Sequence, residues 1–201
     1  MNSYYVFEYS DLFGRILSIG YLKQYTTASI ERSVSYASYF QQIEKDNYAF
    51  APLETSSSLV RTIYPDLKDD FTKMPIYNEC LWAAEAYMRI QGKTRLTFEC
   101  IFLYIPIKKM YSYFPIYHEM DFNHIIKRFE ELYSEQSALS IIIDKYGYSL
   151  EDISKKTGIS YNTLYSLKSR RRDIRKINIE IANKLSIFLH MRMETICEIK
   201  I

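Results

Sequence analysis

The stretch SLEDISKKTGISYNTLYSLKSRRR, residues 149–172, decides the fold of the C-terminal part of this chain. Ser149 is a good N-cap for a helix, and Asp152 follows at the position where a capping box has Glu. Gly158 predicts the end of that helix and a sharp turn, after which Ser160 caps a second helix. Two short helices joined by a tight turn that contains Gly are the physical form of a helix-turn-helix.

A few apolar side chains predict how the two helices pack against each other. Ile153 faces inward from the first helix, Ile159 fills the core from the turn, and Leu164 and Leu167 share one face of the second helix. The remaining side chains of the second helix are largely polar: Tyr161, Asn162, Thr163, Tyr165, Ser166 and Lys168. Because the major groove of DNA admits an α-helix and shows it a distinct pattern at each base pair, this polar face is suited to contacting bases.

The charge of the chain divides near the same region. The 201 residues carry a net charge of +2, but residues 1–136 hold 14 Lys and Arg against 17 Asp and Glu, whereas residues 137–201 hold 12 against 7. A basic part joined to a slightly acidic part is the electrostatic sign of a nucleic-acid-binding module. Six cations lie between Lys168 and Lys176, beside the second helix, where they predict contacts to DNA phosphates; the simpler alternative is a solvated surface loop.

The stretch 149–172 resembles the helix-turn-helix of the lambda repressor and Cro-like (XRE-type) family, and the resemblance covers about residues 137–197. Apolar positions further along match the family's fourth and fifth helices: Ile179, Ile181, Ala182, Leu185, Leu189 and Ile196. The resemblance implies that residues 137–201 form a five-helix domain that binds double-stranded DNA.

The resemblance also implies roles for individual residues. The positions that contact base edges would be Tyr161, Asn162 and Tyr165, with Ser166 as a further contact. The positions that contact phosphates would be Ser160, Lys168, Arg170, Arg171, Arg172 and Arg175. The family often ends this helix with Gly where the present chain has Arg170, so the loop that follows is either helical or extended. Asn162 could instead be solvated, and Tyr161 and Tyr165 could pack on a protein partner.

Residues 1–135 predict a separate helical domain, so we expect an all-α protein with its junction at the polar segment 134–137. Apolar residues that recur at spacings of three and four predict helices over 10–24, 29–46, 59–64, 76–91 and from 121 or 123 to 133. Residues 97–105 fit a short helix or a strand, and we favour the helix because no partner strand is evident. The many tyrosines of this part are expected in the core and in interfaces.

No cluster of residues predicts catalysis, a cofactor or a metal site. The cysteines 80, 100 and 197 are scattered, which suits a reducing cytoplasm and lacks the spacing of a zinc site. His118, Glu119 and Asp121 are close in sequence, but no second His follows at the spacing that a helix would need. No apolar run is long enough for a membrane span, and we expect a cytoplasmic protein that is not an enzyme.

The resulting hypothesis is a sequence-specific, double-stranded DNA-binding transcriptional regulator, a repressor of bacterial or phage origin. A homodimer would place two recognition helices about 34 Å apart, and the N-terminal domain would dimerise or bind a protein partner. The alternative is a protein-binding inhibitor, such as an antitoxin or a phage anti-defence (anti-CRISPR-like) protein, in which the helix-turn-helix is autoregulatory.

Overall fold

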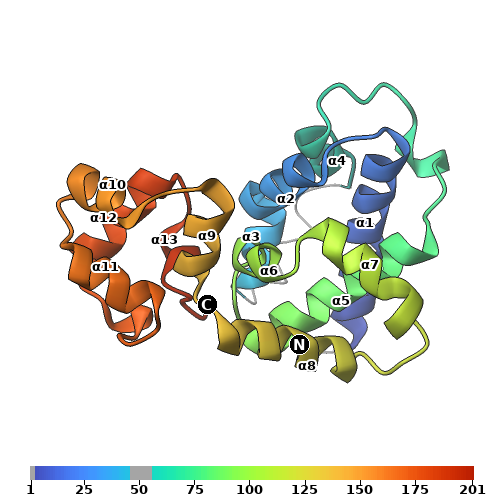
Figure 1. The fold of residues 1–201 in the computed structure, drawn as a ribbon. Helices are drawn as coiled ribbons and strands as arrows, with labels where there is room; N and C mark the ends of the chain where they lie inside the picture. Colours follow the sequence, from blue (N-terminus) through green and yellow to red (C-terminus); the bar gives the residue numbers. More distant parts are fainter. Residues whose placement is uncertain (1–2, 46–55) are drawn as a thin grey trace.

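All regular elements of this computed structural model, which describes residues 3–45 and 56–201, are helices (Figure 1). The prediction of an all-α fold is therefore confirmed for this part of the chain. The sequence also predicts a loop over 47–58, from its Pro and its run of Ser. Residues 47–55 lie outside the described part of the chain, and residues 56–58 are helical instead, since α4 (Ser56–Ile63) begins at Ser56.

The N-terminal part is a helical body built around two long helices. Its elements are α1 (Ser3–Leu22), α2 (Thr27–Tyr36), α3 (Ser38–Glu44), α4, the 3-10 helix η2 (Phe71–Lys73), α5 (Asn78–Thr94), α6 (Phe98–Tyr104), α7 (Ile107–Tyr117) and α8 (Asn123–Glu135). Helices α1 and α5 pack closely because Gly14 has no side chain: a Cβ there would lie 3.0 Å from the Cα of Leu81.

Several helix ends differ from the predictions. The single helix expected over 29–46 is α2 followed by α3, because the backbone of Ala37 is extended between them. The cap of α2 is Thr26, whose Oγ1 accepts the N–H of Ser29 at 3.2 Å. The helix predicted over 76–91, with Gly92 as its stop, is α5, which begins at Asn78 and continues past Gly92 to Thr94. The segment 97–105 is the helix α6, as favoured, and Thr97 caps it by accepting the N–H of Cys100 at 3.1 Å.

Aromatic side chains make up much of the core of the body. Phe13, Phe40 and Phe98 meet edge to face with ring centroids 4.9–6.0 Å apart, a favoured aromatic geometry. Tyr64 and Tyr87 are buried, and each hydroxyl donates to a backbone carbonyl within 2.8 Å. The expectation that the tyrosines of this part serve core packing is thus confirmed for these residues.

The C-terminal part contains five α-helices, as predicted. They are α9 (Ala138–Tyr146), α10 (Leu150–Thr157), α11 (Tyr161–Lys168), α12 (Ile179–Leu189) and α13 (Met193–Ile196), with the 3-10 helix η3 (Ile174–Lys176) before α12. Helices α9 and α13 face the body, whereas α10, α11 and α12 lie away from it (Figure 1). The predicted junction 134–137 comprises the last two residues of α8, its C-cap Gln136 and Ser137, the N-cap of α9.

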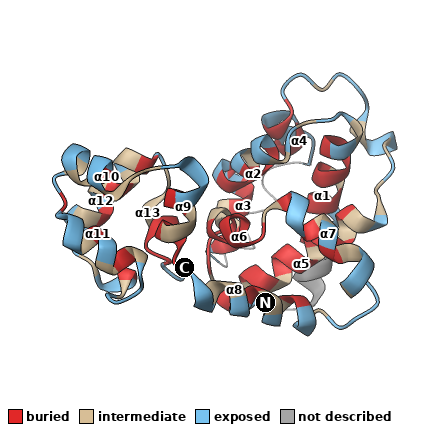
Figure 2. Ribbon diagram, viewed as in Figure 1, coloured by how far each residue is buried: buried red, intermediate tan, exposed pale blue. Residues whose placement is uncertain are grey.

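Buried apolar residues of the body and of the C-terminal part belong to one core cluster, and Figure 2 shows buried segments in both parts. Two buried carboxylates add polar links across the seam. Glu44 of the body pairs with Arg192 at 2.8 Å, and Glu198 near the C-terminus accepts from the Tyr104 hydroxyl at 2.8 Å and from the N–H of Ala138 at 2.7 Å. The two parts are therefore joined by shared core and by charge-assisted hydrogen bonds.

Candidate nucleic-acid interface

Helices α10 and α11 form the helix-turn-helix that the sequence predicts. Ser149 Oγ accepts the N–H of Asp152 at 3.0 Å and donates to its carboxylate at 2.8 Å, which begins α10. Gly158 adopts a left-handed backbone with φ of +70°, a conformation that costs a residue with a side chain about 1–2 kcal/mol. Ser160 then caps α11 by accepting the N–H of Thr163 at 3.2 Å.

The inner face of α11 is buried in the core, and its outer face is exposed to solvent. Leu164 and Leu167 are fully buried, and Ile159 in the turn is buried beside them. Asn162 is exposed in the first turn, where a recognition helix has its base-contacting side chains. Ser166 is half-buried, and its hydroxyl donates to the carbonyl of Thr163 at 2.8 Å. The helix can therefore enter a groove without disturbing its core.

The two tyrosines of α11 form one flat, exposed surface. The rings of Tyr161 and Tyr165 stack with an angle of 9° between their planes and centroids 6.4 Å apart, and each residue remains 43% exposed. The guanidinium of Arg171 lies over the Tyr165 ring at 5.3 Å. Stacked rings beside a cation offer both apolar faces and positive charge to a ligand.

The structure separates the predicted phosphate contacts into paired and unpaired cations. Lys168 pairs with Asp144 at 2.9 Å, and Arg175 forms two hydrogen bonds to Asp173 at 2.9 and 3.0 Å. These bonds from Arg175 lower the pKa of Asp173. Arg171 and Arg172 are exposed and form no ion pair within the described residues. Exposed pairs of this kind contribute little stability, so Lys168 and Arg175 can exchange partners readily.

Arg170 differs from the other cations of the loop because it contacts the body. Its Nη2 donates to the carbonyls of Tyr133, at 2.5 Å, and Gln136, and it pairs with the buried Glu198 at 3.2 Å. The backbone of Arg170 is left-handed, with φ of +54°, at the position where the family often has Gly. The chain therefore turns after α11 and enters the 3-10 helix η3. The side chain of Arg170 is directed to the seam between the two parts of the chain.

The residues weighed for catalysis do not form a site. His118 lies 3.7 Å from the exposed carboxylate of Glu119, and its Nδ1 contacts the carbonyl of Phe114 at 2.9 Å. Asp121 instead accepts the N–H of Asn123 at 2.7 Å at the start of α8. The described residues contain no group of His, Cys, Asp and Glu arranged to hold a metal ion, and the three cysteines are buried.

This geometry defines a helix-turn-helix protein, and the comparison with protein families identifies its type. Residues 138–200 match the model of the Cro/C1-type HTH DNA-binding domain. The C-terminal part is thus a Cro/C1-type domain, as the sequence resemblance predicted, and this supports DNA binding and regulation at the level of that family. The curated proteins and the solved structures gave no match. Among the described residues, no helix has the length and hydropathy of a membrane span.

Two sets of contacts near the interface join residues that are distant in sequence. Asp144 lies at the end of α9, far from the basic loop in sequence, and its position beside Lys168 depends on the packing of α9 against α11. The Arg170 contacts to Tyr133 and Glu198 likewise join residues separated by 37 and 28 positions. Neither pairing has a local sequence signal.

Proposed function

We propose that the protein is a sequence-specific, double-stranded DNA-binding transcriptional repressor. The observation that carries the proposal is the outer face of α11, where exposed polar and aromatic groups stand on a helix whose inner leucines are fully buried. A rigid helix of this kind positions its side chains accurately in the major groove. The family match of residues 138–200 supports the DNA-binding part of the proposal.

In the proposed complex, Asn162 forms two hydrogen bonds to the edge of an adenine, the pairing that an amide side chain makes best. Tyr161 and Tyr165 pack on thymine methyl groups or bond to phosphates, and Ser166 is a further contact near the base edges. These four residues lie on or beside the outer face of one helix of eight residues, so they would span a few base pairs.

Phosphate contacts would come from Ser160 and from the cations that follow α11. Arg171 and Arg172 are available without breaking an ion pair, and Lys168 and Arg175 would exchange Asp144 and Asp173 for phosphate oxygens. We assign Arg170 to the seam with the body rather than to a phosphate, because its guanidinium is already bonded to Glu198 and two carbonyls.

Repression follows from occupancy: a protein of 24.0 kDa seated in the groove at an operator excludes other proteins from that DNA. We further propose a homodimer, whose two recognition helices would read a palindrome with half-sites about one helical turn apart. The body, which lies apart from α11, provides the surface for self-association or for a protein partner.

The test is a selection of bound duplexes from a random pool, followed by binding measurements at several salt concentrations. We expect an enriched palindromic sequence and an affinity that falls steeply with salt, because several phosphate contacts release counterions. The mass of the complex on the selected duplex reports whether one or two chains bind. Absence of both an enriched sequence and salt-sensitive duplex binding would exclude the proposed function.

A further inference from the structure

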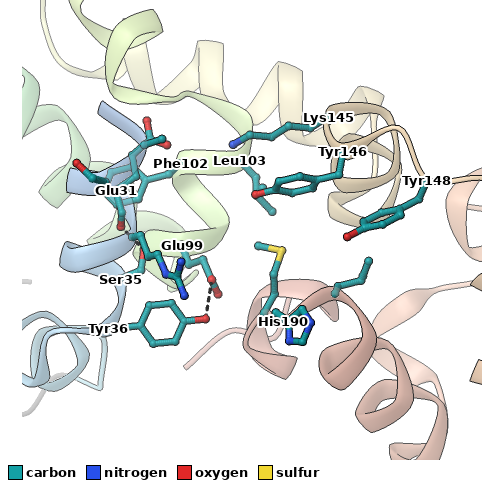
Figure 3. A pocket seen from close by; sticks show the side chains of 15 residues that line it. Glu31, Ser35, Tyr36, Glu99, Phe102, Leu103, Lys145, Tyr146, Tyr148 and His190 are labelled. Atoms are coloured by element: carbon teal, nitrogen blue, oxygen red, sulfur yellow. Dashed lines mark hydrogen bonds between the residues drawn. The ribbon is translucent and has the colours of Figure 1, made fainter. Parts of the chain in front are cut away.

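A cavity lies at the seam between the body and the Cro/C1-type domain. Its volume is about 590 Å³, which is in the range of small-molecule binding sites. Helices α2 and α6 form one wall, and the end of α9, the segment after it and the end of α12 form the other (Figure 3). An occupant would therefore touch both parts of the protein.

The inner surface of the cavity is largely apolar. Phe102 and Leu103 of α6 face Leu189 and Met191 from the C-terminal part, and all four are buried or half-buried. Such a lining favours a ligand with an apolar body, because removing apolar surface from water stabilises the complex by roughly 25 cal/mol per Å².

Aromatic rings stand at the opening of the cavity. Tyr36 on α2 is 47% exposed and Tyr146 on α9 is 54% exposed, and Figure 3 shows them on opposite walls. Exposed tyrosines that face the same space offer flat apolar surfaces with a hydroxyl at the end, which suits the rim of a site for a planar ligand.

The acidic side chains of the cavity are already bonded within the protein. Glu31 accepts the N–H of Ile107 at 2.7 Å, and Glu99 accepts from the hydroxyls of Thr195 at 2.6 Å and Tyr36 at 3.2 Å. Oε1 of Glu31 and both carboxylate oxygens of Glu99 are therefore already occupied by donors of the protein.

The basic side chains of the cavity are not used in this way. Arg32 and Lys145 form no ion pair within the described residues. The Lys145 ammonium lies 5.7 Å from the centroid of the Tyr146 ring, and its charge also acts on Glu31 without pairing with it. Figure 3 shows the Lys145 side chain directed across the cavity toward α6. The charge available to a ligand is therefore positive.

We propose that this cavity binds a small amphipathic organic anion, with an apolar, planar body and a carboxylate, sulfonate or phosphate group. The apolar body lies on Phe102, Leu103, Leu189 and Met191, and the anionic group pairs with Lys145 and Arg32. Because the walls come from both parts of the chain, the bound ligand stabilises their present arrangement. The proposal does not depend on the DNA-binding function.

The test uses 8-anilinonaphthalene-1-sulfonate, an aromatic anion whose fluorescence rises in apolar surroundings, with the neutral N-phenyl-1-naphthylamine as its uncharged counterpart. We expect one saturable site for the sulfonate and an affinity about tenfold lower for the neutral compound, which loses a charge-assisted contact. Lys145→Ala should weaken the sulfonate about tenfold and leave the neutral compound unchanged. The matched control Lys127→Ala removes an exposed cation of α8 and should change neither.

A second variant tests the location by filling the cavity. Ala28 lines it from the exposed side of α2, so Ala28→Phe should block both compounds while the circular dichroism spectrum stays unchanged. Ser112→Phe, at an exposed position on α7, is the matched control and should bind like the parent protein. Absence of saturable binding, or binding that neither Lys145→Ala nor Ala28→Phe weakens, overturns the proposal. Equal affinity for the two compounds overturns its anionic part.

Discussion

At the residue scale, Arg170 and Arg171 are neighbours in sequence with different surroundings. Arg170 bonds to the buried Glu198 and to body carbonyls, whereas Arg171 is exposed beside the Tyr165 ring. The two arginines therefore allow a direct comparison between a cation that joins two parts of a protein and a cation that we propose to contact DNA.

Replacing each arginine in turn should separate these roles. Arg171→Ala should reduce the slope of log affinity for duplex DNA against log salt by about 1 and leave the free energy of unfolding unchanged. Arg170→Ala should lower the free energy of unfolding by about 1–3 kcal/mol, because Glu198 loses a charged partner, and leave the salt slope unchanged. Urea unfolding and fluorescence anisotropy measure the two quantities. The reverse pattern would show that the assignments are exchanged.

Asn162 is the residue that we expect to carry base recognition. Asn162→Ala should remove about 1–3 kcal/mol of discrimination at one base pair and leave the affinity for unrelated duplexes unchanged. Competition between the selected duplex and duplexes with single substitutions measures this. A variant that keeps the full preference at every position would show that Asn162 does not contact a base.

Glu31 provides a prediction about pH. Burial raises the pKa of Glu31, with the N–H of Ile107 and the charge of Lys145 acting in the opposite direction. A carboxyl whose pKa is higher in the folded state binds more protons there, so its contribution to stability falls as the pH rises through that pKa. Glu31→Gln keeps an oxygen for the N–H of Ile107. In urea unfolding, we expect this variant to lose less stability than the parent as the pH rises above the ordinary carboxyl value of about 4.5; an unchanged slope would contradict it.

At the element scale, the turn between α10 and α11 depends on backbone conformation more than on contacts. Gly158 is left-handed, and a Cβ built there would have no neighbour within 4 Å. The cost of a side chain at this position is therefore conformational and not steric.

Gly158→Ala should lower the free energy of unfolding by about 1–2 kcal/mol without changing the preferred DNA sequence. The physical reason is that the left-handed conformation is disfavoured for Ala, while the space around the turn remains open. Denaturation and selection of bound duplexes provide the two measurements. A much larger loss of stability, or a changed preference, would show that the turn contacts more than the structure indicates.

At the scale of the whole molecule, the body and the Cro/C1-type domain are held together by buried charge as well as by apolar packing. Glu44 is fully buried, accepts the N–H of Phe98 at 2.7 Å and pairs with Arg192 at 2.8 Å. Burial raises the pKa of Glu44, and Arg192 opposes that rise. The carboxylate therefore depends on its partner from the other part of the chain.

Arg192→Ala should lower the free energy of unfolding by about 3–5 kcal/mol, because it leaves a buried carboxylate without a cation. Adding Glu44→Gln should recover much of the loss, since the amide is neutral and its oxygen can still accept from Phe98. Thermal and urea unfolding of the two variants measure this difference. If the double variant is no more stable than Arg192→Ala, the charge of Glu44 is not the cause.

The sequence by itself determined the helix-turn-helix, because capping residues, a turn glycine and apolar spacing over a few residues specify that motif. The caps Ser149 and Ser160, the left-handed Gly158 and the leucine pair of α11 act over a few residues, and the structure places each as predicted. The helical class of the body followed from the same short-range periodicity. That periodicity did not predict two of the helix ends, namely the break at Ala37, where the backbone is extended, and the continuation of α5 past Gly92.

Only the tertiary structure decided which cations form ion pairs within the protein and how the body is joined to the domain. Arg170 and Arg171 look equivalent in the sequence, and their difference arises from residues as distant as Tyr133 and Glu198. The cavity at the seam likewise combines α2 and α6 with α9 and α12. Side-chain pairing across long sequence separations depends on how whole helices pack, and no local spacing or composition encodes it.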